Sequence, residues 1–208
     1  FMGLKIFDGQ KEYDCQGFVK NSLEWAARSG VKTIVISARF PLYVEGVRYD
    51  NGEGGREDGA CGFVDLEGAK RTNCEDVKRR NRILSVYEAR LRELAKSFNI
   101  VLIYPIPEAG WNVPKLAFKR AYFYDNMGRL TTSYSRYKNR TGAVVKLFDR
   151  LVYELPNVYA ARVEKVLCSE TTGRCVNADR KGIYYYDDDH LSNSGAHLVA
   201  PIIVDAIK

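Results

Sequence analysis

The sequence contains no long apolar run, very few histidines and none of the common short motifs that carry a reactive serine. No stretch of its 208 residues approaches the roughly 20 apolar residues of a transmembrane helix. It has two histidines, no G-D-S triplet and no G-x-S-x-G sequence. No signal peptide opens the chain, and its start, FMGLKIFDGQ, predicts that it is a piece of a longer protein.

The composition is that of a globular domain with a modest excess of positive charge. Hydrophobic residues make up 46% of the chain, which suffices for a core, and the formal net charge is +6. The basic residues are dispersed, and the densest run, KRRNR at 78–82, is best explained as a solvated helix face. With no nucleic-acid-binding motif beside them, these charges argue against a nucleic-acid partner.

Five cysteines suggest disulfides and an oxidising compartment. Cys168 and Cys175 bracket the polar turn SETTGR, and Cys61 and Cys74 bracket a loop rich in glycine and charge. A zinc site is the alternative, but no C-x-x-C and no nearby histidine support it. Cys15 is left over and is either free or paired outside this chain. We expect no metal and no other cofactor.

Helical and strand patterns alternate along the chain. We expect helices at 17–30, 76–99, 141–156 and 193–208, and strands at 31–40, 100–108 and 157–168. The strand at 31–40 has the apolar pattern of a strand buried on both faces. Residues 44–75 are expected to form a long loop insertion, and 109–140 to be irregular. The alternation predicts an α/β fold, a three-layer sandwich with a mostly parallel sheet flanked by helices.

The last block of the chain, YYYDDDHLSNSGAHLV at 184–199, contains the best candidate for chemistry. In the sequence D-x-x-H, Asp187 can hold one ring nitrogen of His190 while the other faces a substrate, as a general base requires. Such a pair still needs a serine, a cysteine or a water as nucleophile. The alternative is structural: Asp188 and Asp189 suit the start of a helix, and a histidine there is often only a surface residue.

The same block resembles the end of the SGNH (GDSL-like) hydrolase superfamily. Its pattern, Y-x-D-x-x-H-L-S-x-x-G-A, is most similar to that of the SGNH domain fused to membrane acyltransferase-3 proteins. Those proteins O-acylate bacterial surface glycans. IVISARF, with Phe40 where that group has tryptophan, VLIYPIPE and the two-cysteine loop LCSETTGRC extend the resemblance over roughly residues 15–205.

The resemblance implies an SGNH/flavodoxin-like fold, with His190 as the general base and Asp187 as its orienting partner. It implies that residues 1–208 are a single SGNH-like domain lacking the first strand and the Gly-Asp-Ser block, so the nucleophile would lie upstream of Phe1 or on another chain. Where the superfamily places an oxyanion-hole asparagine, this chain has Arg39. Arg39 could contact the oxyanion or the substrate, or could equally pair with an acidic residue of 44–75.

The serines within the chain are weak nucleophile candidates. Ser37 lies in an apolar strand run, so we expect a buried and satisfied hydroxyl. Ser192 and Ser194 follow His190 closely and are better explained as caps of the last helix.

The function that the resemblance implies is O-acyl transfer, most simply O-acetyl transfer, to a cell-surface polysaccharide. The acyl donor would come through a fused or associated acyltransferase-3 membrane domain, and the chain would be a periplasmic domain of an inner-membrane protein. Two alternatives stay open. One is a glycan or peptidoglycan O-acetylesterase, and the other is a catalytically silent glycan-binding module that uses the aromatic side chains of 104–137.

Overall fold

A computed structural model describes residues 5–8, 11–12, 15–59, 63–65, 76–124 and 128–207 of the chain. At its centre lies a parallel sheet of three strands, β3 (Thr33–Ile36), β5 (Asn99–Ile103) and β7 (Val158–Ala161), in the order β3-β5-β7. Both pairings are in regular parallel register. The α/β fold and the three predicted core strands are therefore confirmed.

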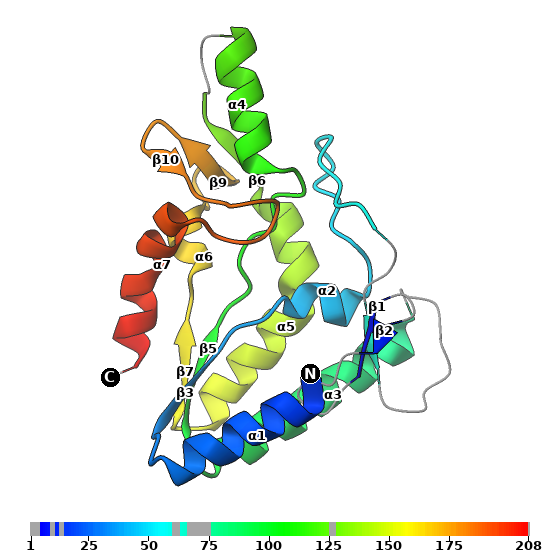
Figure 1. Ribbon diagram of the computed structural model, residues 1–208, viewed down its shortest axis with the longest axis vertical. Helices are drawn as coiled ribbons and strands as arrows, with labels where there is room; N and C mark the ends of the chain where they lie inside the picture. Colours follow the sequence, from blue (N-terminus) through cyan, green and yellow to red (C-terminus); the bar gives the residue numbers. More distant parts are fainter. Residues whose placement is uncertain are drawn as a thin grey trace.

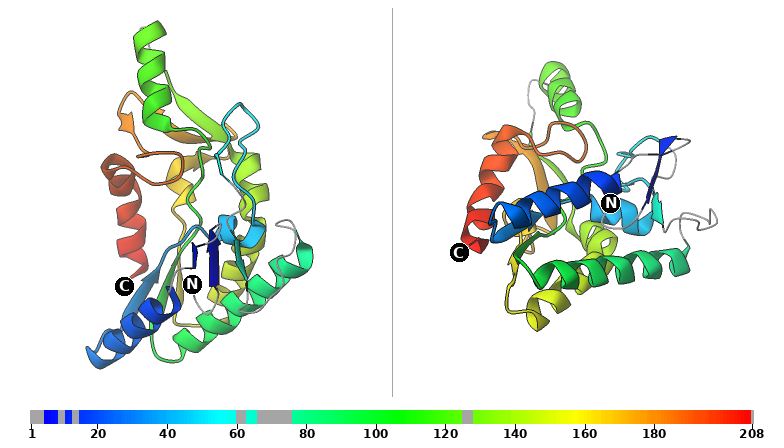
Figure 2. Two further views of the ribbon diagram at one scale, coloured as in Figure 1. Left: turned by 45° about the vertical axis from the view of Figure 1, so that its right-hand side comes forward. Right: turned by 60° about the horizontal axis from the view of Figure 1, so that its bottom comes forward.

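Helices cover both faces of this sheet, as Figures 1 and 2 show. The four long ones that precede or follow the strands are α1 (Cys15–Arg28), α3 (Val77–Ala95), α5 (Tyr134–Glu154) and α7 (Asn193–Ala206). In the right-hand view of Figure 2, α7 lies on one side of the sheet and α3 and α5 lie on the other. The main core lies between the sheet and these two helices, where the ring of Phe40 meets Tyr87 and Phe148 edge to face.

The strand predicted at 31–40 is shorter and less buried than its sequence suggests. It ends at Ile36, and Val35 is 41% exposed. Within the described residues β3 pairs only with β5, so it lies at an edge of the sheet. Helix α7 packs mainly on β5 and β7. The expectation of burial on both faces was therefore wrong. A short helix, α2 (Phe40–Glu45), follows instead.

The region 109–140, expected to be irregular, is largely regular. It contains helix α4 (Val113–Tyr124) and strand β6 (Leu130–Ser133), and α5 begins at Tyr134, seven residues before the predicted start. The side chain of Ser133 caps α5 by accepting a hydrogen bond from the backbone N–H of Arg136. This cap lies outside the apolar pattern on which the predicted boundary rested.

A second, antiparallel sheet lies beyond the carboxyl ends of the parallel strands (Figure 1), and the sequence did not predict it. It consists of β6 together with β8 (Cys168–Ser169), β9 (Arg174–Asp179) and β10 (Gly182–Ile183). Strand β9 pairs with each of the other three strands. The strand predicted at 157–168 stops at Ala161, and helix α6 (Glu164–Leu167) follows it.

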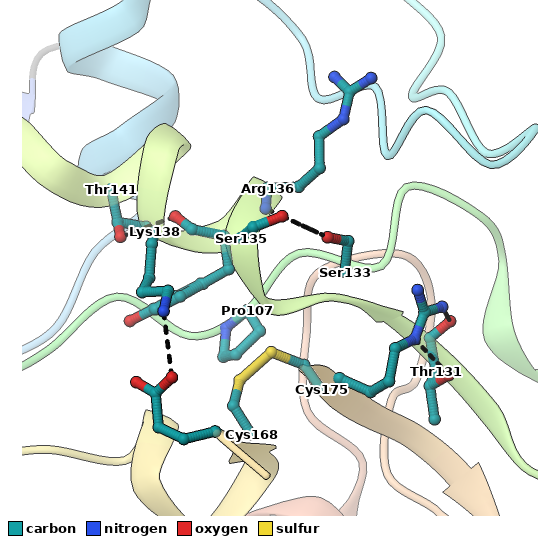
Figure 3. The surroundings of a disulfide bond; sticks show 12 residues. Pro107, Thr131, Ser133, Ser135, Arg136, Lys138, Thr141, Cys168 and Cys175 are labelled. Atoms are coloured by element: carbon teal, nitrogen blue, oxygen red, sulfur yellow. Dashed lines mark hydrogen bonds and ion pairs between the residues drawn. A yellow bond between two sulfur atoms is a disulfide. The ribbon is translucent and has the colours of Figure 1, made fainter. Parts of the chain in front are cut away.

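A disulfide joins Cys168 of β8 to Cys175 of β9, as predicted (Figure 3). The two cysteines are seven residues apart in sequence, so the disulfide closes the hairpin formed by β8 and β9. Cys175 is fully buried. The other predicted pair, Cys61 and Cys74, lies outside the described residues.

The described parts of the 44–75 insertion are packed against the body. Strand β4 (Phe63–Asp65) pairs with β1 (Lys5–Asp8), which also pairs with β2 (Lys11–Glu12). Tyr49 and Asn51 are buried, and the Asn51 side chain donates a hydrogen bond to the carbonyl of Ala109. No helix in the described part of the chain is long and apolar enough to cross a membrane.

Candidate active site

The loop at 186–190 presents the predicted acidic and imidazole groups at the carboxyl end of the parallel sheet. A β-bridge between Tyr185 and Leu191 closes this loop just before α7. The segments that follow β3 and β5 approach it with Arg39 and Glu108. Ligands of open parallel sheets bind at this edge, because the loops that leave the strands converge there.

Asp187 holds the imidazole of His190 as the sequence predicted. Its Oδ2 lies 2.8 Å from Nδ1 of His190, while its Oδ1 accepts hydrogen bonds from the backbone N–H groups of His190 at 2.8 Å and of Asp189 at 3.0 Å. The two backbone bonds fix the carboxylate, and the carboxylate fixes the ring. The His190 side chain is 70% exposed, so the second ring nitrogen, Nε2, is open to a reacting group.

The electrostatics of the pair suit a base that accepts a proton. The hydrogen bond that the imidazole donates to Asp187 raises the pKa of His190, and the nearby charge of Asp189 adds to this effect. Burial alone would raise the pKa of Asp187, but the two backbone N–H groups and the His190 ring outweigh it, and the pKa is lowered. Asp187 is therefore charged when His190 is protonated, which is the state that an imidazolium intermediate needs.

Arg39 is surrounded by three carboxylates. It donates two hydrogen bonds to Glu57, at 3.0 and 2.7 Å, and one to Glu108 at 2.6 Å. Its Nε lies 2.7 Å from Oδ2 of Asp189 in an ion-pair contact. Of the two roles considered for Arg39, the pairing with an acidic residue of 44–75 is therefore present, and the partner is Glu57. This cluster ties the insertion, the end of β5 and the loop at 186–190 together.

Asp189 connects this cluster to the catalytic candidate. Its Oδ1 lies 3.2 Å from Nδ1 of His190, the nitrogen that Asp187 also holds. Burial raises the pKa of Asp189 to about 6, and the charges of Arg39 and His190 only partly oppose this effect. The side chain is almost completely buried, so Asp189 is a support of the loop rather than one of its exposed groups.

Backbone contacts hold the loop from the other side. The N–H groups of Ala109 and Val113, just before and at the start of α4, donate to the carbonyls of Asp188 at 2.7 Å and Asp187 at 3.1 Å. On the α7 side, Ser192 is the N-cap, and its hydroxyl accepts from the N–H of Gly195. The capping role predicted for Ser192 is confirmed, whereas Ser194 lies inside the first turn of α7.

His190 borders two hollows. One is an open groove of about 1000 Å³ along Tyr186, Leu191 and Ser194. The other is a smaller pocket of about 220 Å³ that also includes Ser37 and Arg39. Ser37, the first residue after β3, is exposed, so the prediction of a buried hydroxyl was wrong. A group that enters the small pocket would lie between the imidazole and the carboxyl end of β3.

Asp187, Asp189 and His190 also offer ligand atoms within 4.8 Å of one another, as a metal ion would need. In this arrangement Arg39 and the imidazole already supply the positive partners of both carboxylates. The donor set therefore fits a hydrogen-bonded acid–base pair at least as well as a cation site.

Sequence reasoning did not identify Glu57 as the acidic partner of Arg39 within 44–75, and it missed Glu108. Glu57 lies in the insertion and Glu108 follows β5, and no spacing in the sequence relates them to Arg39. The usable signal was weak: a charged residue directly after an apolar strand run, as at Glu108, has to be satisfied at the same sheet edge.

Comparison with known proteins gives two matches. The model of a family described as "SGNH domain (fused to AT3 domains)" matches residues 2–205. The solved periplasmic domain of a lipopolysaccharide acetyltransferase from Salmonella ser. Paratyphi A is similar in structure, with a TM-score of 0.50 and 15% sequence identity. The similarity covers 97% of this chain and 67% of that one, and at this identity it shows a shared fold. No curated protein sequence matches.

Proposed function

Because this chain belongs to the family of SGNH domains fused to AT3 domains, we propose that it is the acyl-transferring domain of a glycan O-acyltransferase. It transfers an acyl group, most simply acetyl, to a hydroxyl of a bacterial cell-surface polysaccharide. The observation that carries this proposal is the 2.8 Å contact between Asp187 Oδ2 and His190 Nδ1 beside an open groove.

In this proposal the nucleophile is a serine that lies outside residues 1–208. The edge position of β3 supports it, because a further parallel strand beside β3 would complete the sheet and end next to Ser37. A serine at the end of that strand would enter the 220 Å³ pocket that His190 borders. Residues 1–208 would then be one SGNH-like domain whose first strand and nucleophile block are supplied from elsewhere.

The chemistry proceeds in two steps of the same kind. The serine oxygen attacks the acyl carbonyl of the donor while His190 Nε2 takes the hydroxyl proton, and the donor leaves with that proton. A sugar hydroxyl then attacks the acyl-serine, gives its proton to His190, and the proton returns to the serine oxygen. In each step Asp187 stabilises the imidazolium.

Arg39 takes part mainly by positioning in this scheme. Its guanidinium already pairs with Glu57, Glu108 and Asp189, and through Asp189 it holds the loop that carries His190. It also borders the small pocket, so a direct contact with the oxyanion or the substrate stays part of the proposal. The acyl donor is delivered by the AT3 partner, and the site faces the periplasm.

The two histidines of the chain give a matched test. His190→Gln removes the base, whereas His197→Gln changes the only other histidine, which is exposed on α7 and contacts its own helix backbone at Asn193. We would introduce each change in the producing organism and measure the O-acetyl content of the purified surface polysaccharide by NMR. We expect His190→Gln to abolish the O-acetyl signal and His197→Gln to leave it unchanged.

Whether the O-acetyl content falls, rises or stays the same in His190→Gln distinguishes acyl transfer from the two alternative functions. An O-acetylesterase that uses the same pair would give a higher O-acetyl content in His190→Gln. A silent binding module would give no change, and equal O-acetyl content in wild type and His190→Gln would refute the proposal. Labelling of the native protein with a fluorophosphonate, followed by mass spectrometry, would then show whether any serine is reactive.

A further inference from the structure

Helix α4 projects away from the body of the molecule (Figure 1). It carries four exposed aromatic side chains. Phe118, Tyr122, Phe123 and Tyr124 are each between 66% and 75% exposed. The rings of Phe118 and Tyr122 stack at 5.9 Å, and Tyr122 meets Phe123 edge to face at 5.0 Å. A cluster of this size on a convex, projecting element is costly in water unless it contacts something apolar.

The first half of the same helix is firmly anchored. Val113 and Ala117 are buried in a core cluster with Leu130 and Tyr185. The exposed aromatic side chains are therefore confined to its last two turns, and they are not a core face that has lost its cover. The helix is a fixed support for its aromatic end.

The charges on and around α4 are mostly of one sign. The helix contains Lys115, Lys119 and Arg120 and no aspartate or glutamate. At the turn between β9 and β10, which lies beside α4 in Figure 1, Arg180 and Lys181 line a hollow of about 430 Å³. Arg129 and Asp179 also line it, so three cations face one carboxylate there.

We propose that α4 is a membrane-surface contact, and that its aromatic end enters the headgroup region of a bilayer containing anionic lipids. Tyrosine and phenylalanine next to lysine and arginine is the composition that binds a bilayer interface, where the rings lie at the headgroup level and the cations pair with anionic lipids. A polysaccharide chain is the weaker candidate, because a ligand site of that kind is concave and offers several fixed polar groups. The exposed end of α4 projects outward, and its polar groups are the tyrosine hydroxyls and the long, flexible side chains of Lys119 and Arg120.

This contact would also set the height of the site above the surface. The N–H groups of Ala109 and Val113, at the anchored end of α4, bond the carbonyls of Asp188 and Asp187. The 12 residues of α4 span about 18 Å at 1.5 Å per residue. Binding by the far end of the helix would hold the loop at 186–190 at most about that distance from the headgroups. The proposal is independent of the acyl transfer proposed above.

The experiment is flotation of the completed domain, residues 1–208 together with the strand and serine block proposed above, with vesicles of phosphatidylethanolamine and phosphatidylglycerol (3:1), and with vesicles of phosphatidylcholine alone. One variant carries Tyr122→Gln, Phe123→Gln and Tyr124→Gln. The matched control carries Phe18→Gln, Trp25→Gln and Tyr153→Gln, three exposed aromatic residues on α1 and α5. Glutamine keeps the helix propensity, so circular dichroism should show both variants folded.

We expect wild type and the control variant to float with the anionic vesicles, and the α4 variant to lose at least tenfold in binding. A second variant, Lys115→Gln, Lys119→Gln and Arg120→Gln, should lose about fivefold per cation removed and most of its salt dependence. Equal flotation of all variants, or no flotation of wild type, would overturn the proposal. So would loss of binding to purified surface polysaccharide by the α4 variant with unchanged vesicle binding, which would assign α4 to the glycan instead.

Discussion

Replacing Asp187 with asparagine tests the assignment of the acid–base pair most directly. The carboxylate makes three contacts: Oδ1 accepts from the N–H groups of Asp189 and His190, and Oδ2 holds Nδ1 of the His190 ring. Asparagine can keep the first two through its oxygen. Its amide group can only donate toward Nδ1, which forces the ring proton onto Nε2 and removes the base.

The expected effect on the rate is large and the effect on stability is small. Loss of the correct tautomer in a triad of this kind lowers the rate about 10³- to 10⁴-fold. Because the His190 ring is 70% exposed, loss of its pairing should change the free energy of unfolding by about 1 kcal/mol or less. Asp188→Asn is the matched control, since that neighbouring side chain makes no described contact with His190, and its rate should stay within about threefold of wild type.

The assay is the initial rate of acyl transfer to the polysaccharide between pH 5 and 9, with urea unfolding of each variant. His190 acts as a base only when neutral, so the wild-type rate should rise with pH through its pKa, which Asp187 raises. The residual rate of Asp187→Asn should inflect at lower pH. The reasoning fails if Asp187→Asn keeps a rate within threefold of wild type, or if its inflection stays in place.

Three further changes test the supports of the site. Arg39→Met removes the cation that its buried carboxylate partners share, so it should destabilise the fold at pH 7 by about 3 kcal/mol. The loss should be smaller near pH 5, where the carboxylates gain protons. Thermal unfolding at both pH values measures the difference, and equal losses at the two pH values would contradict this explanation. The double change Cys168→Ser and Cys175→Ser opens a loop of seven-residue separation and should cost about 2–3 kcal/mol in urea unfolding, a loss under 0.5 kcal/mol being inconsistent with the loop argument. Gly195→Ala would bring a Cβ to 2.1 Å from the Tyr184 carbonyl and should lower the free energy of unfolding by about 1–3 kcal/mol. Gly142→Ala, in the open middle of α5, should raise it by roughly 0.5–1 kcal/mol. Comparable unfolding midpoints for the two variants would refute the steric explanation.

Much of the central fold followed from local patterns. The helices α3 and α7 begin and end close to the predicted residues, and the β-branched and apolar runs gave the three parallel strands. What failed were the elements whose stability depends on partners. Strands β6 and β9 have mixed polar sequences, and they form because they pair with each other. Strand β9 also pairs with β8, to which the disulfide joins it.

The candidate base was predictable because its parts are adjacent in sequence. Asp187 and His190 lie three residues apart, so a local turn is enough to join them, and Gly195 and Ser192 secure the start of the following helix. The sequence by itself thus determined the contact between Asp187 and His190, the hairpin disulfide and the α/β order.

Only the tertiary structure decided what surrounds the pair. Arg39, Glu57 and Glu108 come from three distant segments and meet because parallel strands end at one sheet edge, where burial forces charges to pair. The exposure of Ser37, and the projection of α4 with its aromatic end uncovered, are likewise set by what packs against each element. An apolar pattern in one segment shows which side chains favour burial, but it does not show whether another element packs against them.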